Sequence, residues 1–288
     1  MSVNPLQISF SKMQGIGNDF VVIDARILPQ IDWTSLAIKL CDRKFGIGAD
    51  GLLVLEESQT SDAFMRMYNP DGTPDVCGNG LRCVARYIAQ RWGVYSDLSD
   101  VELSIDTFGG NYHASVKDVA SDSPVILVTM SYPKFGACDI PFAADLDCVK
   151  DYKLSVLDRE FAITALSTGS THTIIFCDDL PEDADFFRYS PAIESHILFP
   201  ERTSIMWTKV VETGRLKIRI WERGAGETWG CGTGACAVGV AAMTHGFAHT
   251  EAIVESRGGA LTIRWQSGGE VSMIGPAEFV FEGSLVLA

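Results

Sequence analysis

The motif Cys-Gly-x-Gly occurs twice in this chain, at residues 77–80 and again at residues 231–234. Each copy follows a polar loop and precedes apolar residues with helical spacing, so each cysteine is expected where a loop turns into a helix. A single motif of this kind would mean little. Two copies, one in each half of the chain and at the same point of the turn, indicate a duplicated domain whose halves face each other across a cleft.

The composition is that of a folded protein with two domains or one large domain, because 47% of the 288 residues are hydrophobic and 21% are charged. The net charge of −14 would repel a phosphate backbone, so we expect no nucleic-acid partner. No run of about 18 apolar residues is present, so we expect no membrane span. The start, MSVNPLQISF, lacks the features of a signal peptide, which favours a cytoplasmic protein.

The eight cysteines do not form a metal-binding pattern. None is spaced as Cys-x-x-Cys, and the chain has only five histidines, so we expect no zinc site or other bound metal. In a reducing compartment the cysteines are thiols. Most are expected to be small buried residues, with Cys77 and Cys231 as the exceptions.

Hydrophobic patterning predicts a β-rich chain with a few helices. One helix should begin after Asp32, and two more should span about Asn79–Trp92 and Gly232–Met243. Tyr132-Pro133, followed by Gly136, is the best candidate boundary between the halves. Strands are predicted at 8–13, 20–24, 51–56, 64–68, 125–130, 154–156, 161–166, 171–176, 205–211 and 216–222.

Both Cys-Gly-x-Gly turns are suited to binding an anion. Glycine lets backbone amides approach a ligand closely, and the first N–H groups of a helix carry the positive end of its dipole. A carboxylate binds readily there, and the pKa of a thiol at such a position can fall to about 3.5–7.5. Two such turns facing each other would place a sulfur on either side of one small carboxylate-bearing molecule.

This arrangement suits the inversion of a carbon that bears hydrogen. A thiolate removes the proton on one face, and a thiol returns a proton on the other face. The charge that develops on the carboxylate meets the N-termini of both helices, which therefore bind the transition state better than the ground state. Such a reaction does not strictly need a pyridoxal cofactor.

Two other interpretations use the same residues. Residues 232–237 also fit the G-x-G-x-x-A pattern of a dinucleotide site, but the chain lacks the regular βαβ alternation of such a domain. A Cys-His acyl-transfer enzyme, with Cys77 or Cys231 as nucleophile and His172 as base, is the mechanistic alternative.

Several long stretches of the sequence resemble the diaminopimelate epimerase family. They are Phe10–Phe20 (FSKMQGIGNDF), Arg43–Gly51 (RKFGIGADG), Asn69–Thr73 (NPDGT), Cys77–Cys83 (CGNGLRC), Glu222–Ala235 (ERGAGETWGCGTGA) and Ile274–Ala277 (IGPA). The resemblance covers essentially the whole chain, with the motifs in the family's order.

The resemblance implies an α/β fold of two pseudo-symmetric domains, each a curved and mostly antiparallel sheet wrapped around a central helix. The domains would be 1–130 plus 276–288 and 131–275, with the active site in the cleft between them. It also implies a homodimer that needs no cofactor and converts the small-molecule amino acid LL-diaminopimelate to meso-diaminopimelate, in the synthesis of lysine and peptidoglycan precursors.

The resemblance also assigns roles to individual residues. Cys77 and Cys231 correspond to the two acid/base residues, and His172 and Glu222 to the residues that flank them and help to set their protonation. Arg223 is suited to a distal carboxylate, which its guanidinium can bind with two parallel hydrogen bonds. The other expected substrate-binding positions are the amides of Gly78, Asn79, Gly232 and Thr233 around the reacting carboxylate, and the side chains of Asn18 and Asn69.

Two positions depart from the family's pattern. Ser170 and Ser204 stand where asparagines that bind the distal end of the substrate are expected. A serine hydroxyl is shorter and cannot offer the paired donor and acceptor of an amide. Two hypotheses follow: a diaminopimelate epimerase that tolerates the serines, and a related racemase that acts on another amino acid.

Overall fold

A computed structural model describes residues 6–287 of the chain. The chain divides into two compact units: unit 1 runs to Val128 and resumes at Gly275, and unit 2 is Thr129–Ile274. Among the described residues each unit combines β-strands with two α-helices, so the predicted mixed α/β, two-domain fold is confirmed. None of the helices within residues 6–287 has the length and apolar character that a membrane span requires.

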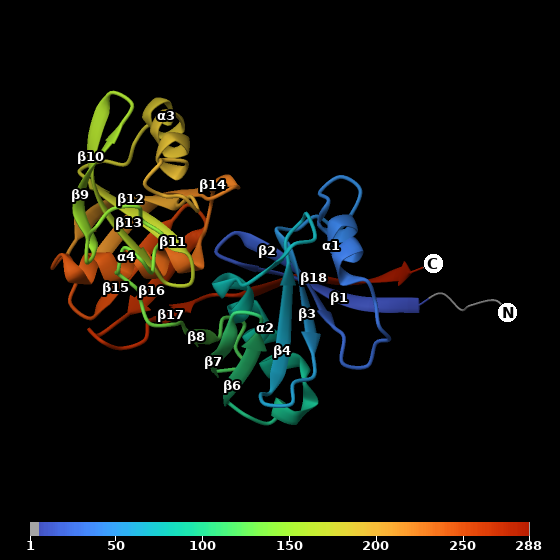
Figure 1. Cartoon of the computed structure of the whole chain (residues 1–288). Coiled ribbons are helices and arrows are strands. Elements are labelled where there is room, and N and C mark those ends of the chain that lie inside the picture. Colours follow the sequence, from blue (N-terminus) through green and yellow to red (C-terminus); the bar gives the residue numbers. More distant parts are fainter. Residues whose placement is uncertain (1–5, 288) are drawn as a thin grey trace. The chain divides into compact units, whose positions relative to one another are not determined.

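Unit 1 is a mixed sheet with α1 and α2. Its strands pair in the order β1–β2 antiparallel, β2–β3 parallel across α1, β3–β4 antiparallel, β4–β6 parallel across α2, and β6–β7 antiparallel. The last strand, β18, lies beside β1 and pairs with it antiparallel (Figure 1). The elements are β1 (Leu6–Gly15), β2 (Asn18–Asp24), α1 (Trp33–Cys41), β3 (Gly51–Glu56), β4 (Ala63–Tyr68), β5 (Pro74–Asp75), α2 (Gly78–Arg91), η1 (Gly93–Tyr95), β6 (Asp100–Thr107), β7 (Gly110–Lys117), β8 (Val125–Thr129) and β18 (Glu278–Leu287).

Unit 2 repeats this order with α3 and α4. Its strands pair as β10–β11 antiparallel, β11–β12 parallel across α3, β12–β13 antiparallel, β13–β15 parallel across α4, and β15–β16 antiparallel. The same sequence of pairings in both units is the signature of a duplicated fold. The elements are β9 (Val149–Val156), β10 (Arg159–Ser167), β11 (Thr171–Cys177), α3 (Asp183–Glu194), β12 (Ser204–Glu212), β13 (Arg215–Glu222), β14 (Gly226–Thr228), α4 (Gly232–Thr244), β15 (Glu251–Ser256), β16 (Gly259–Arg264) and β17 (Ser272–Gly275).

Helix α2 is the central helix of unit 1, and it packs against β1, β2, β3, β4 and β7. It starts and ends one residue earlier than the predicted Asn79–Trp92, a difference within the normal uncertainty of helix ends. Because strands surround it, the start of the helix, and with it Cys77, has a fixed place in the unit. The apolar face predicted from the sequence is completely buried and consists of Leu81, Val84, Ala85 and Ile88.

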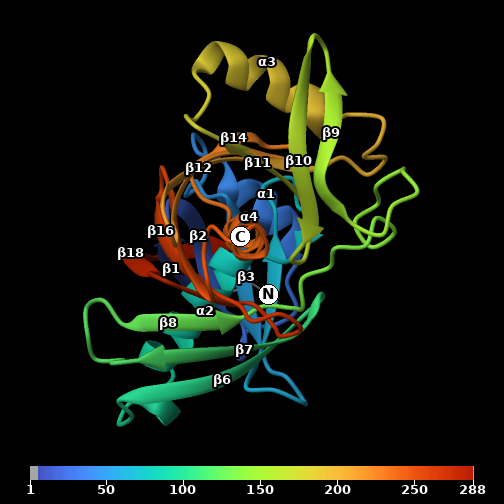
Figure 2. The same cartoon turned by 90° about the vertical axis from the view of Figure 1, so that its left-hand side faces the viewer.

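Helix α4 is the central helix of unit 2 and is built mainly from alanine, glycine and valine. Figure 2 looks along this helix, with β11, β12 and β16 around it, and all three strands contact it. Gly239 lies so close to β16 that a Cβ atom there would stand 2.7 Å from the Cβ of Ile263. The small residues of α4 therefore allow the strands to approach from several sides, which leaves the helix without an exposed face.

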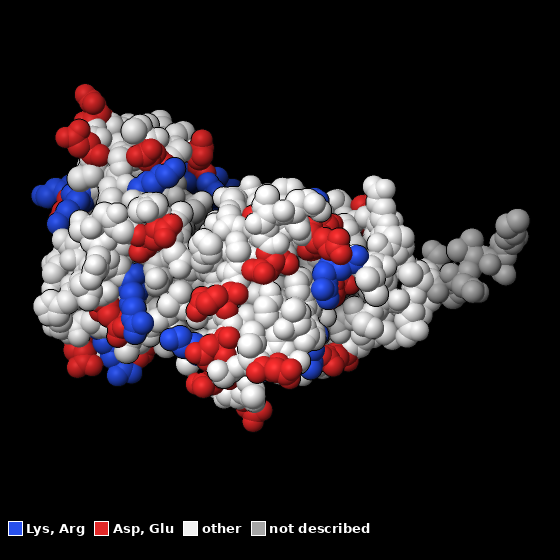
Figure 3. Space-filling view, turned by 90° about the horizontal axis from the view of Figure 1, so that it is seen from below, with Lys and Arg blue, Asp and Glu red and all other residues white. Residues whose placement is uncertain are grey.

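The charged side chains agree with the acidic composition of the chain. On the face drawn in Figure 3, Asp and Glu side chains are spread among smaller groups of Lys and Arg. Many of the basic side chains are engaged in ion pairs, such as Arg219 with Asp183 and Arg215 with Glu255.

Candidate active site

Cys77 caps the N-terminus of α2, as the sequence predicts. Its backbone is extended, with φ of −131°, and its carbonyl accepts the first hydrogen bond of the helix, from the amide of Leu81. Gly78 and Asn79 are the first residues of the helix, so their amides belong to its positive end. The Cys77 side chain is half-buried.

Asn18, at the start of β2, connects the two polar side chains of this turn. Its carbonyl oxygen Oδ1 accepts from the Cys77 thiol, with the sulfur 3.5 Å away, and from Asn79 Nδ2 at 3.1 Å. Its own amide nitrogen donates to Asp50 at 2.7 Å. Asn69, in contrast, forms hydrogen bonds within its own hairpin, to Thr73 and Asp75. The structure therefore groups Asn18 with the Cys77 turn, whereas the hydrogen bonds of Asn69 stay within the β4–β5 hairpin.

A charged cluster behind Asn18 was not anticipated from the sequence. Arg43 bridges Asp19 and Asp50, at 2.6 and 2.7 Å, and Lys12 pairs with Asp19 at 2.5 Å. Burial alone would raise the pKa of Asp19, but the hydrogen bonds from Arg43 and Lys12 outweigh it and lower the pKa to about 2. Arg43 also holds the side chain of Asp50, which accepts from the Asn18 amide nitrogen and so orients that amide. Arg43 and Asp50 both lie in the family motif RKFGIGADG, which is the signal that could have indicated them.

Arg82 is a second residue that the sequence did not single out. Its side chain is completely buried on α2, and its guanidinium donates to Asn79 Oδ1 at 2.8 Å and to the carbonyl of Pro276 at 3.2 Å. This contact leaves the amide nitrogen of Asn79 facing Asn18. Arg82 therefore fixes which way the Asn79 amide points, although it lies more than one helical turn from Cys77.

Cys231 caps the N-terminus of α4 in the same way. Its φ is −128°, and its sulfur accepts a hydrogen bond from the amide of Gly234 at 3.3 Å. The hydroxyl of Thr233 lies 3.6 Å from the same sulfur. Unlike Cys77, Cys231 is buried, with only 7% of its surface exposed.

The protonation of Cys231 differs from the expectation for a helix N-terminus. Burial and the nearby carboxylate of Glu222 raise the pKa of the Cys231 thiol well above its ordinary value, although the contacts from Thr233 and Gly234 act in the opposite direction. The expectation of a lowered pKa is therefore wrong for this cysteine, because desolvation of the thiolate outweighs the helix amides. The raised pKa keeps the proton on the Cys231 sulfur at neutral pH.

His172 lies beside Cys231, on the completely buried part of β11. Its Nε2 atom is 3.9 Å from the Cys231 sulfur, 3.3 Å from the Thr233 hydroxyl and 3.5 Å from the Ser170 hydroxyl. Burial lowers the pKa of His172 to about 4, so the imidazole is neutral at neutral pH. Among the described residues its Nδ1 is the one buried side-chain nitrogen or oxygen without a hydrogen bond.

Glu222 and Arg223 follow each other at the turn from β13 to β14. The Thr228 hydroxyl donates to the carboxylate of Glu222. Arg223 donates its backbone amide to the hydroxyl of Ser204 at 3.0 Å and its guanidinium to the carbonyl of Glu201 at 2.9 Å. The structure therefore gathers six of the predicted residues at the start of α4: Ser170, His172, Ser204, Glu222, Arg223 and Thr233 lie around Cys231, directly or through one another.

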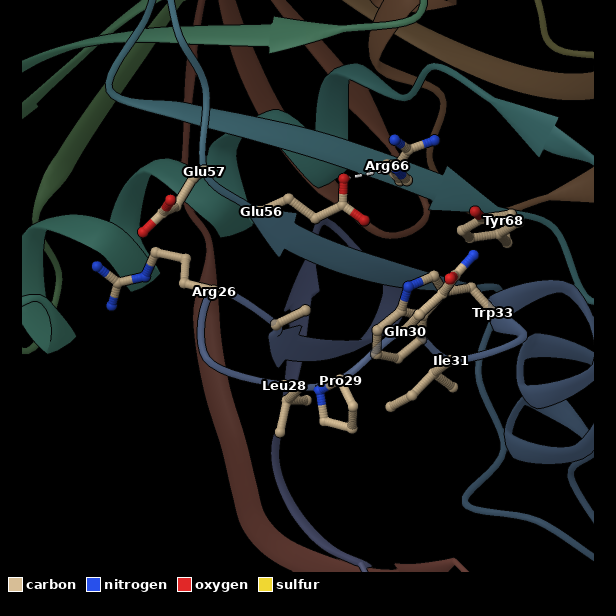
Figure 4. Close-up of a pocket in the computed structure, with 11 residues that line it drawn as sticks. Arg26, Leu28, Pro29, Gln30, Ile31, Trp33, Glu56, Glu57, Arg66 and Tyr68 are labelled. Carbon is tan, nitrogen blue, oxygen red and sulfur yellow. Dashed lines mark hydrogen bonds and ion pairs between the residues drawn. The ribbon is translucent and has the colours of Figure 1, made fainter.

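Two pockets lie elsewhere in the units. One, of about 410 Å³, opens in unit 1 between the loop after β2 and the ends of β3 and β4, and contains the ion pair between Glu56 and Arg66 (Figure 4). The other, of about 530 Å³ in unit 2, is lined by aromatic rings such as Tyr132 and Trp265. Neither pocket includes a predicted site residue. In the described part of the chain no three His, Cys, Asp or Glu side chains are grouped as metal ligands.

Comparison with known proteins identifies the family to which the sequence is similar. The sequence model of the diaminopimelate epimerase family matches residues 10–135 and 164–280. A protein of Desulforudis audaxviator named diaminopimelate epimerase is 40% identical over 98% of this chain and all of its own length. One of the same name from Desulfitobacterium hafniense is 41% identical over 96% of this chain and 97% of its own.

Solved structures show the same fold at low sequence identity. A hydroxyproline epimerase from Agrobacterium vitis has a TM-score of 0.68 at 14% identity and covers 99% of this chain and 93% of its own. A PhzF-family protein of Bacillus anthracis has a TM-score of 0.70 at 19% identity, over 98% of this chain and all of its own. With the sequence matches extending over nearly the whole length of both partners, this chain belongs to the diaminopimelate epimerase family.

Proposed function

We propose that this chain is a cofactor-independent epimerase that inverts one α-carbon of diaminopimelate, from the LL to the meso form. The observation that carries the proposal is the repeated position of Cys77 and Cys231, each at the N-cap of the central helix of its own unit. The names of the relatives over nearly the full length support the substrate. The reaction requires the two units to bring these sulfurs to opposite faces of one stereocentre.

The two cysteines take different parts in the first half of the reaction. Burial and Glu222 hold the proton on Cys231, so we assign Cys231 as the acid that returns a proton and Cys77 as the base that removes one. In the reverse direction the roles exchange. As the α-proton leaves, negative charge moves onto the substrate carboxylate, where the amides at the starts of α2 and α4 stabilise it.

The distal end of the substrate would meet Arg223 rather than the two serines. Ser204 is only 7% exposed and its hydroxyl accepts from the Arg223 amide, while the Ser170 hydroxyl lies against His172. Both serines thus contact residues of the proposed site. This arrangement supports the diaminopimelate hypothesis, since the guanidinium of Arg223 suits a second carboxylate. A racemase that acts on another amino acid is the alternative outcome of the test.

The substrate is tested by following α-proton exchange in D₂O with a panel of L-amino acids, LL-diaminopimelate included. We expect loss of the α-proton signal by NMR with diaminopimelate and none with amino acids that lack a distal carboxylate and amine. Exchange confined to another amino acid would replace diaminopimelate as the substrate while leaving the two-cysteine mechanism in place.

The roles of the cysteines are tested by Cys77→Ala and Cys231→Ala, each of which should abolish epimerisation. The matched control is Cys138→Ala, because Cys138 is an exposed cysteine of unit 2 outside the proposed site. Chiral chromatography of the diaminopimelate product measures all three variants. Full activity in either of the first two would reject the assignment.

We further propose that the protein is a cytoplasmic homodimer. All eight cysteines are thiols rather than disulfides, as a reducing compartment would keep them. Strand β18 presents the exposed apolar side chains Val280, Phe281 and Val286, which a second copy would cover. Sedimentation velocity gives the mass in solution, and a monomer at micromolar concentration would contradict the dimer.

A further inference from the structure

Glu194, the last residue of α3, is a buried carboxylate that holds the turn carrying Glu222 and Arg223. Its side chain is only 7% exposed. One oxygen, Oε2, accepts from the indole N–H of Trp221 at 2.6 Å, and the other, Oε1, accepts from the backbone amide of Gly224 at 2.8 Å. Trp221 directly precedes Glu222, and Gly224 directly follows Arg223. The carboxylate of Glu194 is therefore hydrogen-bonded to the residues on both sides of the Glu222–Arg223 pair.

The segment after α3 holds the same turn from a second direction. Ser204 accepts from the backbone amide of Arg223, and the carbonyl of Glu201 accepts from its guanidinium. The amide of Thr203 in turn donates to the carbonyl of Glu194 at 3.2 Å, which keeps this segment against the end of the helix. Residues 194–204 therefore form a cradle for the turn, and Glu194 is the member of the cradle whose negative charge faces it.

The charge of Glu194 is balanced by Arg202, whose guanidinium also donates to Oε1. Arg202 adopts a φ of +62°, a conformation that residues other than glycine rarely take. Such a conformation persists when surrounding contacts over-determine it. The buried carboxylate of Glu194 thus has one ion pair and two N–H donors. Its removal would leave these donors without an acceptor.

We propose that Glu194 is a positioning residue for the epimerase site, which sets the places of Glu222 and Arg223 and thereby the binding of the distal end of diaminopimelate. The inference rests on the proposed function. Glu194 does not touch the reacting atoms. It acts through hydrogen bonds to the two residues that flank the Glu222–Arg223 pair, and its effect is therefore on the geometry of the pair.

Glu194→Gln tests this role with almost no change of volume. The amide replaces one acceptor oxygen by an NH₂ donor, which must face either the Trp221 indole N–H or the Gly224 amide with Arg202. In either orientation of the amide, the hydrogen bonds on one of these two sides are lost. We expect KM for diaminopimelate to rise about tenfold, because Arg223 contributes mainly to binding. We expect kcat to change less than about threefold, because the Thr228 hydroxyl also holds Glu222.

The matched control is Glu182→Gln, which removes the same charge from the N-cap of the same helix, where the side chain makes no capping hydrogen bond. Its KM should equal that of the wild type. Trp221→Phe removes the donor of the hydrogen bond to Glu194 Oε2 and should also raise KM. It provides a second route to the result where Glu194→Gln lowers the yield of folded protein.

A spectroscopic readout separates positioning from general destabilisation. The indole N–H resonance of Trp221, assigned by its loss in Trp221→Phe, should move upfield and exchange faster with solvent in Glu194→Gln, while the other indole resonances keep their positions. An unchanged Trp221 resonance together with an unchanged KM would overturn the inference. A wild-type protein that leaves diaminopimelate unaltered would instead overturn the proposed function, and with it the substrate role of Glu194.

Discussion

At the scale of the residue, Cys231 shows that a helix N-terminus does not by itself decide the pKa of a thiol. Cys231 accepts the Gly234 amide as expected, yet burial and the neighbouring Glu222 raise the pKa of its thiol. His172, 3.9 Å away, is kept neutral by burial in the same environment. The low polarity that disfavours ions in this part of unit 2 makes Cys231 a proton donor, which is what the proposed reaction needs from one of its sulfurs.

Because the imidazole of His172 is buried, we expect the free energy of unfolding to depend on pH. Its pKa of about 4 lies below the ordinary value of 6.5, so between these values the unfolded chain binds a proton that the folded chain does not. The stability that is fully present above pH 6.5 is therefore lost as the pH falls towards 4, by about 3 kcal/mol from this group.

The measurement is the free energy of urea unfolding at pH 7 and at pH 4.5, in the wild type and in His172→Gln. The variant should lose less stability than the wild type over this range. His113→Gln, which changes an exposed histidine of unit 1, should behave as the wild type. Equal losses in the wild type and in His172→Gln would show that His172 is not held neutral in the fold.

At the scale of the element, the two central helices were predictable and α3 was not. Helix α2 follows from its apolar spacing, and its predicted bounds differ by one residue at each end. Helix α4 follows from the run of small apolar residues after Cys231, since it is apolar on all sides. Helix α3 contains Pro191 and lacks a clear apolar period, so its sequence does not indicate a helix. Strand β6 does alternate between exposed and buried residues, so period-two patterning could have identified it.

The same limit applies to the candidate site. The cysteines and their glycines could be read from one repeated motif, and the resemblance supplied Asn18, His172, Glu222 and Arg223. The contact of Arg82 with Asn79 spans three residues of one helix, so helical spacing could have indicated it. The role of Glu194 could not be predicted, because it acts on Trp221 and Gly224, which are far away in the sequence, through contacts that only the fold creates. No local pattern records such a contact.

Close packing of α4 predicts the effect of enlarging Gly239. A Cβ atom at this position would stand 2.7 Å from the Cβ and the Cγ2 of Ile263 on β16, and the Cβ cannot move without shifting the strand. Gly239→Ala should therefore lower the free energy of unfolding by about 1–3 kcal/mol. Urea denaturation measures it, with Gly93→Ala as the control, since nothing lies within 4 Å of a Cβ built there. Equal stability of the two variants would refute this view of the packing.

At the scale of the whole molecule, the chain is one folding pattern used twice. Both units place a cysteine at the N-cap of a helix that crosses between two parallel strands, β4 and β6 in unit 1, β13 and β15 in unit 2. The surroundings of the two cysteines have diverged. Cys77 is half-buried beside the Asn18 amide, whereas Cys231 is buried beside a neutral histidine. A duplicated scaffold with unequal surroundings suits a reaction in which one sulfur gives a proton and the other takes one.

If both sulfurs act on one carbon, we expect them to come within reach of each other when the site is empty and closed. Diamide should then form a disulfide between Cys77 and Cys231, abolish activity, and do neither in the presence of substrate, with recovery on reduction. Peptide mapping by mass spectrometry identifies the pair. The double variant Cys138→Ala/Cys148→Ala removes the exposed cysteines and should be inactivated in the same way. Activity that survives diamide would contradict this proximity.

The position of the isotope early in the reaction tests the two-sulfur mechanism most directly. LL-diaminopimelate is incubated with the wild-type enzyme in D₂O, and both isomers are analysed by mass spectrometry before a tenth of the substrate is converted. Two bases predict a meso product that carries deuterium at the inverted carbon, while the remaining LL substrate keeps its proton, because one sulfur removes protium and the other delivers deuterium from solvent. Early meso product that retains the substrate's own proton would mean that a single base serves both faces, which would contradict the assignment of Cys77 and Cys231 as an acid–base pair.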